Sequence, residues 1–405
     1  NGNVADISEI INKVFAVTMA ARFFALSVFL PTYTAIRIKT SSVPAHNAFE
    51  LVHVEEVAEQ GTNFTLYRHK KTGTEVLSGV NDDDNKVFGI AFRTPIADST
   101  GVAHILEHSV LCGSDKYPVK EPFVHLLRSS MQTYLNALTY PERTLYPVAS
   151  TNLKDFYNLM DVYLDAVFHP RAIKDPMILQ QEGWHYEIKS AKDPLTYKGI
   201  VFNEMKGVYG SPDSRMQDAA KRNLFPNTTY RFNSGGNPKE ITSLSFEGFK
   251  AFYDAHYHPA NARVFFYGND PVEARLAKLD EYLKEYGQPA QPVEKTRVET
   301  QPKWSAPRRA EVPFPVAAGQ DESEAKHMLT MEWMLNEEAI SPTENFALSL
   351  VSHLLLGSFS APMHKALLDS ALGESVTGGG FSDSLKQSTF SVGLKGIAAG
   401  NVSKA

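Results

Sequence analysis

His104-Ile105-Leu106-Glu107-His108 is the stretch around which the rest of the sequence is interpreted. On an α-helix, side chains three and four positions apart share one face, so both imidazoles and the carboxylate would point the same way. Two imidazole nitrogens at this spacing suit one tetrahedral metal ion, with a carboxylate beside the water on that metal. The segment therefore predicts a helix that carries two metal ligands, His104 and His108, and a general base, Glu107.

The order of the motif, H-x-x-E-H, is the inverzincin arrangement, the reverse of H-E-x-x-H. A motif this short also arises by chance, so the hypothesis requires a third ligand. A catalytic zinc ion takes three protein ligands and keeps one position for water. Glu182, Glu187 and Glu204 all follow the motif. Spacing alone does not choose among these three glutamates.

The composition is that of an ordinary globular protein, with 405 residues, 43% apolar and 21% charged. The formal net charge of −6 argues against nucleic acid as a partner. The single cysteine, Cys112, excludes an internal disulfide framework and a thiolate zinc site. We expect Cys112 to be a buried thiol, not a nucleophile, although it lies four positions after His108.

The first 48 residues have the composition of an organelle targeting leader. The sequence from Ile10 to Phe49 contains no acidic residue, carries lysines and arginines, and includes an apolar run interrupted by Pro31. Acid-poor, basic segments with hydroxyl residues are typical of transit peptides. An amphipathic leader with no targeting role is the alternative. Neither this run nor another stretch predicts a membrane-spanning helix, so we expect no stable membrane insertion.

Alternation and turn residues indicate three strands at 63–69, 74–80 and 86–93, connected as an antiparallel meander. Ser99 or Thr100 is expected to cap the helix that carries the motif. Apolar residues at helical spacing predict a further amphipathic helix over 152–168.

A stretch rich in proline, glutamine and charge, 287–309, predicts a linker between a first domain at 49–286 and a second at 310–405. The second domain repeats the order of strand (329–335), helix (344–356) and Gly-Ser. Aligning the two Gly-Ser pairs puts Leu348, Val351 and Ser352 where His104, Glu107 and His108 stand. We therefore expect a homologous second domain without the metal, ending unfinished at Ala405.

Four segments carry a specific resemblance: Gly101–His108, Leu135–Pro147 (LNALTYPERTLYP), Gln180–Trp184 (QQEGW) and Ile200–Gly207 (IVFNEMKG). In this order they resemble the presequence proteases, organelle metallopeptidases of the pitrilysin class. The similarity runs from about residue 50 to the end of the chain. It implies an α+β fold, with a mixed and mainly antiparallel sheet and helices packed on one face, repeated in two homologous domains.

The resemblance also implies the roles of individual residues. His104, His108 and Glu204 would bind Zn²⁺, and Glu107 would take a proton from the zinc-bound water. Asn136 and Ala137 match the family's edge strand, to which a substrate peptide adds as a further strand. An apolar pocket beside the scissile bond would be lined by Leu111, Phe123, Val124 and Leu127, for which plain core packing is an equal alternative.

The function implied is zinc-dependent endopeptidase action on unfolded peptides, such as cleaved targeting presequences, in the mitochondrial matrix or plastid stroma. The full-length protein is expected to be monomeric. The family's enzymes also use an arginine and a tyrosine from a second half, so we expect these 405 residues alone to bind zinc but hydrolyse peptides poorly. Two alternatives stay open: a non-catalytic peptide-binding or scaffold subunit of the same fold, and a peptidase that processes presequences.

Overall fold

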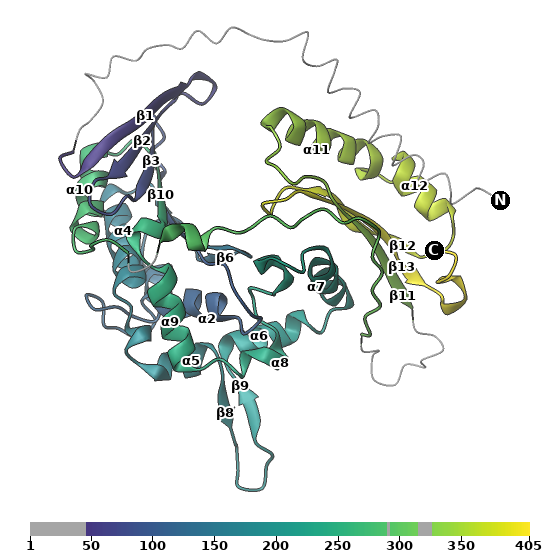
Figure 1. Ribbon diagram of the computed structural model, residues 1–405. Coiled ribbons are helices and arrows are strands. Elements are labelled where there is room, and N and C mark those ends of the chain that lie inside the picture. Colours follow the sequence, from purple (N-terminus) through teal and green to yellow (C-terminus); the bar gives the residue numbers. More distant parts are fainter. Residues whose placement is uncertain (1–45, 290–291, 315–325) are drawn as a thin grey trace. The chain divides into compact units, whose positions relative to one another are not determined.

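The structure is a computed structural model that describes residues 46–289, 292–314 and 326–405 (Figure 1). It divides into two compact units, one within Ser42–Phe314 and one within Pro315–Ala405. Residues 1–45 of the predicted leader lie outside the described ranges, and the predicted domain boundaries stay predictions. Within those ranges, the helices are too short or too polar to cross a bilayer.

The first unit is built on one mixed sheet of eight strands, with the order β1-β2-β3-β10-β4-β7-β5 and with β6 also paired to β7. Its strands are β1 (Phe49–Val57), β2 (Thr62–His69), β3 (Glu75–Val80), β4 (Lys86–Arg93), β5 (Gln132–Leu135), β6 (Leu138–Thr139), β7 (Arg143–Ser150) and β10 (Ala262–Gly268). Neighbouring strands are antiparallel except β3 and β10, which are parallel.

The three predicted strands are confirmed as β2, β3 and β4, but the predicted meander is wrong at its third strand. β10 lies between β3 and β4 and is paired to both of them. Alternate residues of β10, Ala262, Val264 and Phe266, are buried. An apolar strand of this kind gains most from a central place, where both of its edges are hydrogen-bonded. Turn residues between β3 and β4 carry no information about this insertion from a distant segment.

Helices and one small hairpin complete the first unit. The helices are α2 (Val102–Val110), α3 (Pro122–Ser129), α4 (Leu153–Phe168), α5 (Pro176–Glu182), α6 (Ile200–Val208), α7 (Pro212–Leu224), α8 (Pro238–Ile241), α9 (Phe246–His256) and α10 (Val272–Leu283); the hairpin pairs β8 (His185–Glu187) with β9 (Thr196–Lys198). The amphipathic helix predicted over 152–168 is confirmed as α4, and the Asn152 side chain caps it by accepting the Asp155 N–H.

Burial alternates along the central strands β4 and β10, so one face of the sheet is core and the other is more open. Helices and sheet share one continuous apolar core. The α+β fold predicted from the sequence, a mainly antiparallel sheet with helices on one face, is therefore confirmed.

The segment at 292–309, predicted as part of a linker, bonds to the first unit. The Trp304 indole donates to the carbonyl of Leu224 at 3.2 Å, and the Gln301 side chain accepts the Asn227 N–H at 3.0 Å. These hydrogen bonds hold the segment along the unit that contains the motif.

Within residues 326–405, the second unit consists of a three-stranded antiparallel sheet and two helices. Its elements are β11 (His327–Met334), α11 (Pro342–Leu356), α12 (Pro362–Asp369), β12 (Ser375–Ser382) and β13 (Thr389–Ile397), with the strand order β11-β13-β12. The strand and helix predicted there are confirmed as β11 and α11. Ser352, aligned with His108, accepts the backbone N–H of Phe381 at 2.9 Å. At this position the second unit has a side chain that bonds helix to sheet.

A fully buried ion pair connects the elements of the first unit. The Arg275 guanidinium on α10 contacts Asp270 at 2.5 Å, and both side chains have no exposed surface. The guanidinium also donates to Ser78 Oγ at 2.9 Å and to the carbonyls of Gly79 and Gly268 at 3.0 and 2.9 Å. Tyr157 on α4 donates to the other Asp270 oxygen at 2.8 Å. The Arg275–Asp270 pair thus joins β3, β10, α4 and α10.

We predict that Arg275→Met lowers the free energy of unfolding by about 3–5 kcal/mol, because it leaves the Asp270 carboxylate buried without its partner. Chemical denaturation of the two proteins measures this difference. The matched control is Arg263→Gln, which removes the half-exposed pair with Glu75 at 2.8 Å. That change should cost no more than about 1 kcal/mol. Equal effects of the two substitutions would contradict the assigned role of Arg275.

Candidate metal centre

The helix that carries the motif, α2, is buried along its length: among its nine residues only His108 is partly exposed. The predicted cap is wrong. Gly101 occupies the N-cap position with a left-handed φ of 72° and no side-chain cap. The Ser99 hydroxyl instead accepts the Asn233 N–H at 3.2 Å, and the Thr100 hydroxyl donates to Asp98 at 2.6 Å. Glycine is required here because it adopts this φ at little cost.

Gly101 also lets a second loop approach the helix. A Cβ atom at this position would lie 2.9 Å from Gly236 Cα and 3.0 Å from the carbonyl oxygen of Gly235. The same Gly235 carbonyl is 3.0 Å from His104 Nδ1. The start of α2 and the orientation of the His104 ring therefore depend on one close backbone contact.

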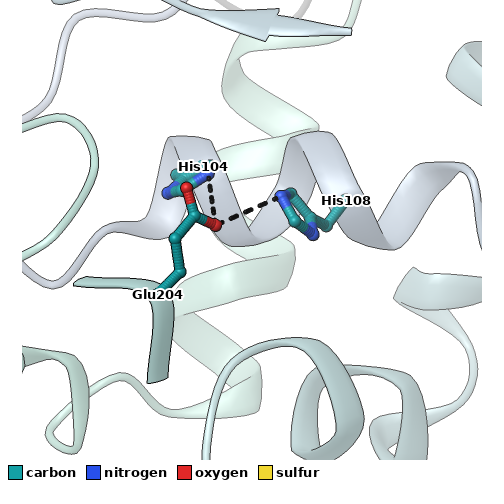
Figure 2. Close-up of side chains that lie close together, drawn as sticks. All are labelled: His104, His108 and Glu204. Carbon is teal, nitrogen blue, oxygen red and sulfur yellow. Dashed lines mark ion pairs between the residues drawn. The ribbon is translucent and has the colours of Figure 1, made fainter. Parts of the chain in front are cut away.

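His104, His108 and Glu204 converge, as Figure 2 shows. Glu204 lies on α6, and its Oε2 is 3.7 Å from His104 Nε2 and 4.0 Å from His108 Nε2. One possible ligand atom from each of the three residues lies within 4.8 Å of the others. Ligands about 2 Å from a tetrahedral zinc ion are roughly 3.3 Å apart, so a small contraction would complete such a site. Two imidazole nitrogens and a carboxylate oxygen are a donor set that fits zinc.

The Nδ1 atoms of both histidines are held by acceptors outside this cluster. A carbonyl oxygen only accepts, so His104 donates from Nδ1 to Gly235 and leaves Nε2 as the free lone pair. His108 Nδ1 lies 3.2 Å from Glu182 Oε2. This contact orients the His108 ring so that its Nε2 lone pair is also free. Hydrogen bonds from the non-ligating nitrogen are the usual means by which proteins orient a metal-binding histidine.

Glu182 is buried and charged. Burial alone would raise the pKa of its carboxyl, but the hydrogen bonds from His108, Gln181 and Cys112 outweigh burial and lower that pKa. For His108, burial acts to lower the imidazole pKa. The hydrogen bond to Glu182 and the charges of Glu107, Glu182 and Glu204 act the other way, and the net pKa is raised.

Cys112 takes part in the same arrangement as a protonated thiol. Burial, followed by the charge of Glu182, raises the pKa of the thiol. Its Sγ lies 3.3 Å from Glu182 Oε1 and 3.5 Å from the His108 carbonyl. A thiol with a raised pKa is a poor nucleophile, as predicted from the sequence, but Cys112 is only half-buried, whereas a buried thiol was expected.

The predicted substrate-binding residues fall into two groups. Asn136 and Ala137 lie in the break between β5 and β6, which both pair with β7 at the edge of the sheet. Tyr163 from α4 donates to the Asn136 carbonyl at 3.2 Å. These two residues thus lie at one edge of the sheet, and pairing of a peptide strand there stays a prediction.

The four predicted pocket residues are not equivalent. Leu111 is part of the buried core, Phe123 is half-buried against it, Val124 is half-buried and Leu127 has 45% of its surface exposed. The buried residue of α3 that anchors it to the core is Leu126. Core packing accounts for Leu111, and a pocket at the other three stays a prediction.

Three residues at the centre were missed as site residues by the sequence analysis. Glu182 was weighed only as a possible ligand, and Gly235 was not predicted to take part in the site. Thr139, whose hydroxyl donates to Glu107 Oε2 at 2.8 Å, was not singled out. Glu182 and Thr139 do lie inside the QQEGW and LNALTYPERTLYP segments, which was the available signal.

Comparison with known proteins gives matches along most of the chain. The family model described as Insulinase (Peptidase family M16) matches residues 96–202, and the one described as Peptidase M16 inactive domain matches residues 243–405. Presequence protease 1, chloroplastic/mitochondrial, of Arabidopsis thaliana is 51% identical over 88% of this chain and 33% of its own length. The chain belongs to the pitrilysin family of peptidases.

Three further proteins extend this comparison. The mitochondrial presequence protease of Xenopus laevis is 39% identical over 87% of this chain and 34% of its own length. Protein HypA of Clostridium perfringens is 42% identical over 86% of this chain and 36% of its own length. The crystal structure of pitrilysin matches the fold with a TM-score of 0.57 at 14% identity, over 89% of this chain and 36% of that one.

The chain therefore spans about a third of the length of these relatives. The resemblance to presequence proteases stated from sequence segments is confirmed. The organelle names of the plant and frog relatives support the predicted location in the mitochondrial matrix or plastid stroma.

We predict that zinc binding by this pitrilysin-family chain weakens as pH falls through the raised pKa of His108. Above that pKa the imidazole is neutral and free to bind; below it a proton must leave first, so affinity falls about tenfold per pH unit for one proton. The raised pKa places the onset above pH 6.5, the usual value. Chelator competition between pH 5.5 and 8.5 measures the profile.

In Glu182→Gln the charge that favours the His108 imidazolium is lost, so the onset should move to lower pH. The affinity at high pH should fall roughly tenfold or more, since removing such an outer partner commonly costs 10–100-fold. The control is Glu187→Gln, on the hairpin strand β8, where the half-buried Glu187 pairs with Lys198. An unchanged profile in Glu182→Gln would show that Glu182 does not act through His108.

We predict that Gly101→Ala also weakens zinc binding by about tenfold, since the new Cβ must push the Gly235 carbonyl away from His104. Left-handed φ adds about 1 kcal/mol of backbone strain for alanine. The control is Gly73→Ala, which has a similar φ of 76° and open space around the new Cβ. Equal loss of stability with equal zinc affinity in the two variants would refute the link to His104.

Proposed function

We propose that the protein to which this chain belongs is a zinc-dependent endopeptidase that degrades unfolded peptides, such as cleaved organelle presequences. The observation that carries the proposal is the convergence of His104, His108 and Glu204, with Glu107 one position before His108 on the same helix. The relatives named presequence proteases support this substrate class.

His104, His108 and Glu204 would hold the zinc ion. Zinc bound there supplies a more acidic water and polarises the carbonyl of the bond to be cleaved. His104 and His108 keep their Nε2 lone pairs available because both Nδ1 atoms are engaged elsewhere. Glu204, with half of its side chain exposed, comes from a different helix and closes the ligand set.

Glu107 would act as the general base. Its carboxylate is almost buried and accepts a hydrogen bond from Thr139, which limits its orientation. It would take a proton from the attacking water as the carbon–oxygen bond forms. It would then return this proton to the departing amide nitrogen as the peptide bond breaks, so no covalent bond to the protein forms.

The substrate would extend the sheet at the edge formed by β5 and β6, which lies opposite the β1 edge. Hydrogen bonds to main-chain groups at Asn136 and Ala137 would hold the peptide without reading its side chains. Such a mode suits varied, unfolded peptides better than folded proteins. Because the chain spans about a third of its relatives, activity is expected of the full-length protein, and only weak activity of this part.

The test is Glu107→Gln in the full-length protein. We predict one retained zinc ion per chain and a loss of peptide turnover of at least 100-fold, since the amide cannot accept the proton. Zinc content and cleavage of a quenched fluorescent presequence peptide measure the two outcomes. The Glu187→Gln control should keep both. Unchanged turnover in Glu107→Gln would remove the proposed base, and absence of turnover in the unmodified protein would favour a peptide-binding scaffold.

A further inference from the structure

We propose that Thr139 is a positioning residue that holds the catalytic Glu107 and ties it to the strand edge where the peptide would bind. This inference rests on the proposed function, because it assigns a role within that reaction. It adds a residue that neither binds metal nor contacts the reacting atoms.

The hydrogen bond from Thr139 gives the two carboxylate oxygens of Glu107 different roles. Thr139 Oγ1 donates to Oε2 at 2.8 Å. Within residues 46–289, 292–314 and 326–405, Oε1 accepts no hydrogen bond. One oxygen is therefore held, while the other is left to accept a proton. A hydroxyl bonded to a carboxylate forms a charge-assisted hydrogen bond, which is stronger than a neutral one.

The hydroxyl is fixed by its own surroundings. Thr139 pairs with Thr144 of β7, and Leu138 pairs with Leu145. The Thr144 side chain is fully buried and shares a hydrogen bond of 2.8 Å with Thr94. A β-branched side chain on a paired strand has few accessible rotamers, so it presents its hydroxyl in a defined direction. The Glu107 side chain is longer and more flexible, so a donor in a fixed position limits the rotamers that it samples.

The position of Thr139 in the chain connects this hydrogen bond to the proposed substrate-binding edge. It lies two residues after Ala137, on the same edge segment along which the proposed substrate would pair. The base on α2 is thus bonded directly to the strand that would position the peptide carbonyl. A proton acceptor misplaced by about 1 Å can lose 100-fold in rate. Thr139 therefore acts on the rate of the chemical step, with little effect on peptide or metal binding.

The experiment compares Thr139→Val, which keeps the shape but removes the donor, with Thr139→Ser, which keeps the donor. In the full-length protein we predict that Thr139→Val lowers kcat by roughly 10–100-fold, the usual range for a hydrogen bond to a charged group. KM, zinc content and Tm should stay close to those of the unmodified protein. Thr139→Ser should recover most of kcat. Thr196→Val, on the exposed strand β9, is the control for the same chemical change.

A readout independent of activity is the position of Glu107 in crystal structures of the 405-residue chain. The carboxylate should be displaced or spread over several rotamers in Thr139→Val and ordered in Thr139→Ser. An ordered Glu107 with unchanged kcat in Thr139→Val would overturn the proposal, and so would equal losses in the valine and serine variants. Failure of the proposed function is separate, because it would appear as unchanged turnover in Glu107→Gln.

Discussion

The geometry of this site depends on the hydrogen bonds that the Nδ1 atoms of His104 and His108 make. His104 donates a hydrogen bond from Nδ1 to the backbone carbonyl of Gly235, 131 positions later, and His108 Nδ1 pairs with the buried Glu182 carboxylate on α5. These two contacts turn both Nε2 atoms toward Glu204. A motif on a helix supplies the side chains, but it does not by itself orient the rings. That orientation requires the loop at Gly235, the helix α5 and the helix α6 to be packed around α2.

This requirement explains why α2 is buried to such an extent. Glu107 and Glu182 are both nearly inaccessible, and burying carboxylates is unfavourable unless each is hydrogen-bonded or paired. Thr139 bonds Glu107, while His108, Gln181 and Cys112 surround Glu182. The sheet supplies the rigid support: β6 and β7 place Thr139, and the Arg275 cluster joins β3 and β10 to the helices behind them. The buried polar cluster around Arg275 thus stabilises the fold, and separate buried polar contacts at Glu107 and Glu182 orient the site.

Much of this could be predicted from the sequence, and the limits have physical causes. The helix at His104–His108 follows from local spacing, and the strands β2, β3 and β4 follow from alternation and turns. Glu204 was chosen by resemblance, because three glutamates satisfy the same chemistry. The insertion of β10 and the roles of Gly235, Glu182 and Thr139 depend on contacts between distant segments, which no local pattern encodes. The cap at Gly101 was missed because a hydroxyl residue is the usual cap, whereas here a close approach of two backbones requires glycine.

We propose that His104, His108 and Glu204 together bind one zinc ion, and zinc K-edge X-ray absorption on the zinc-loaded chain would detect these ligands. We predict one zinc per chain, with scattering from two imidazoles and nitrogen or oxygen ligands at about 2.0–2.1 Å. In Glu204→Ala the coordination should change while the two imidazole contributions remain. A chain that binds no zinc, or a spectrum unchanged by His104→Ala, His108→Ala and Glu204→Ala, would contradict this ligand assignment.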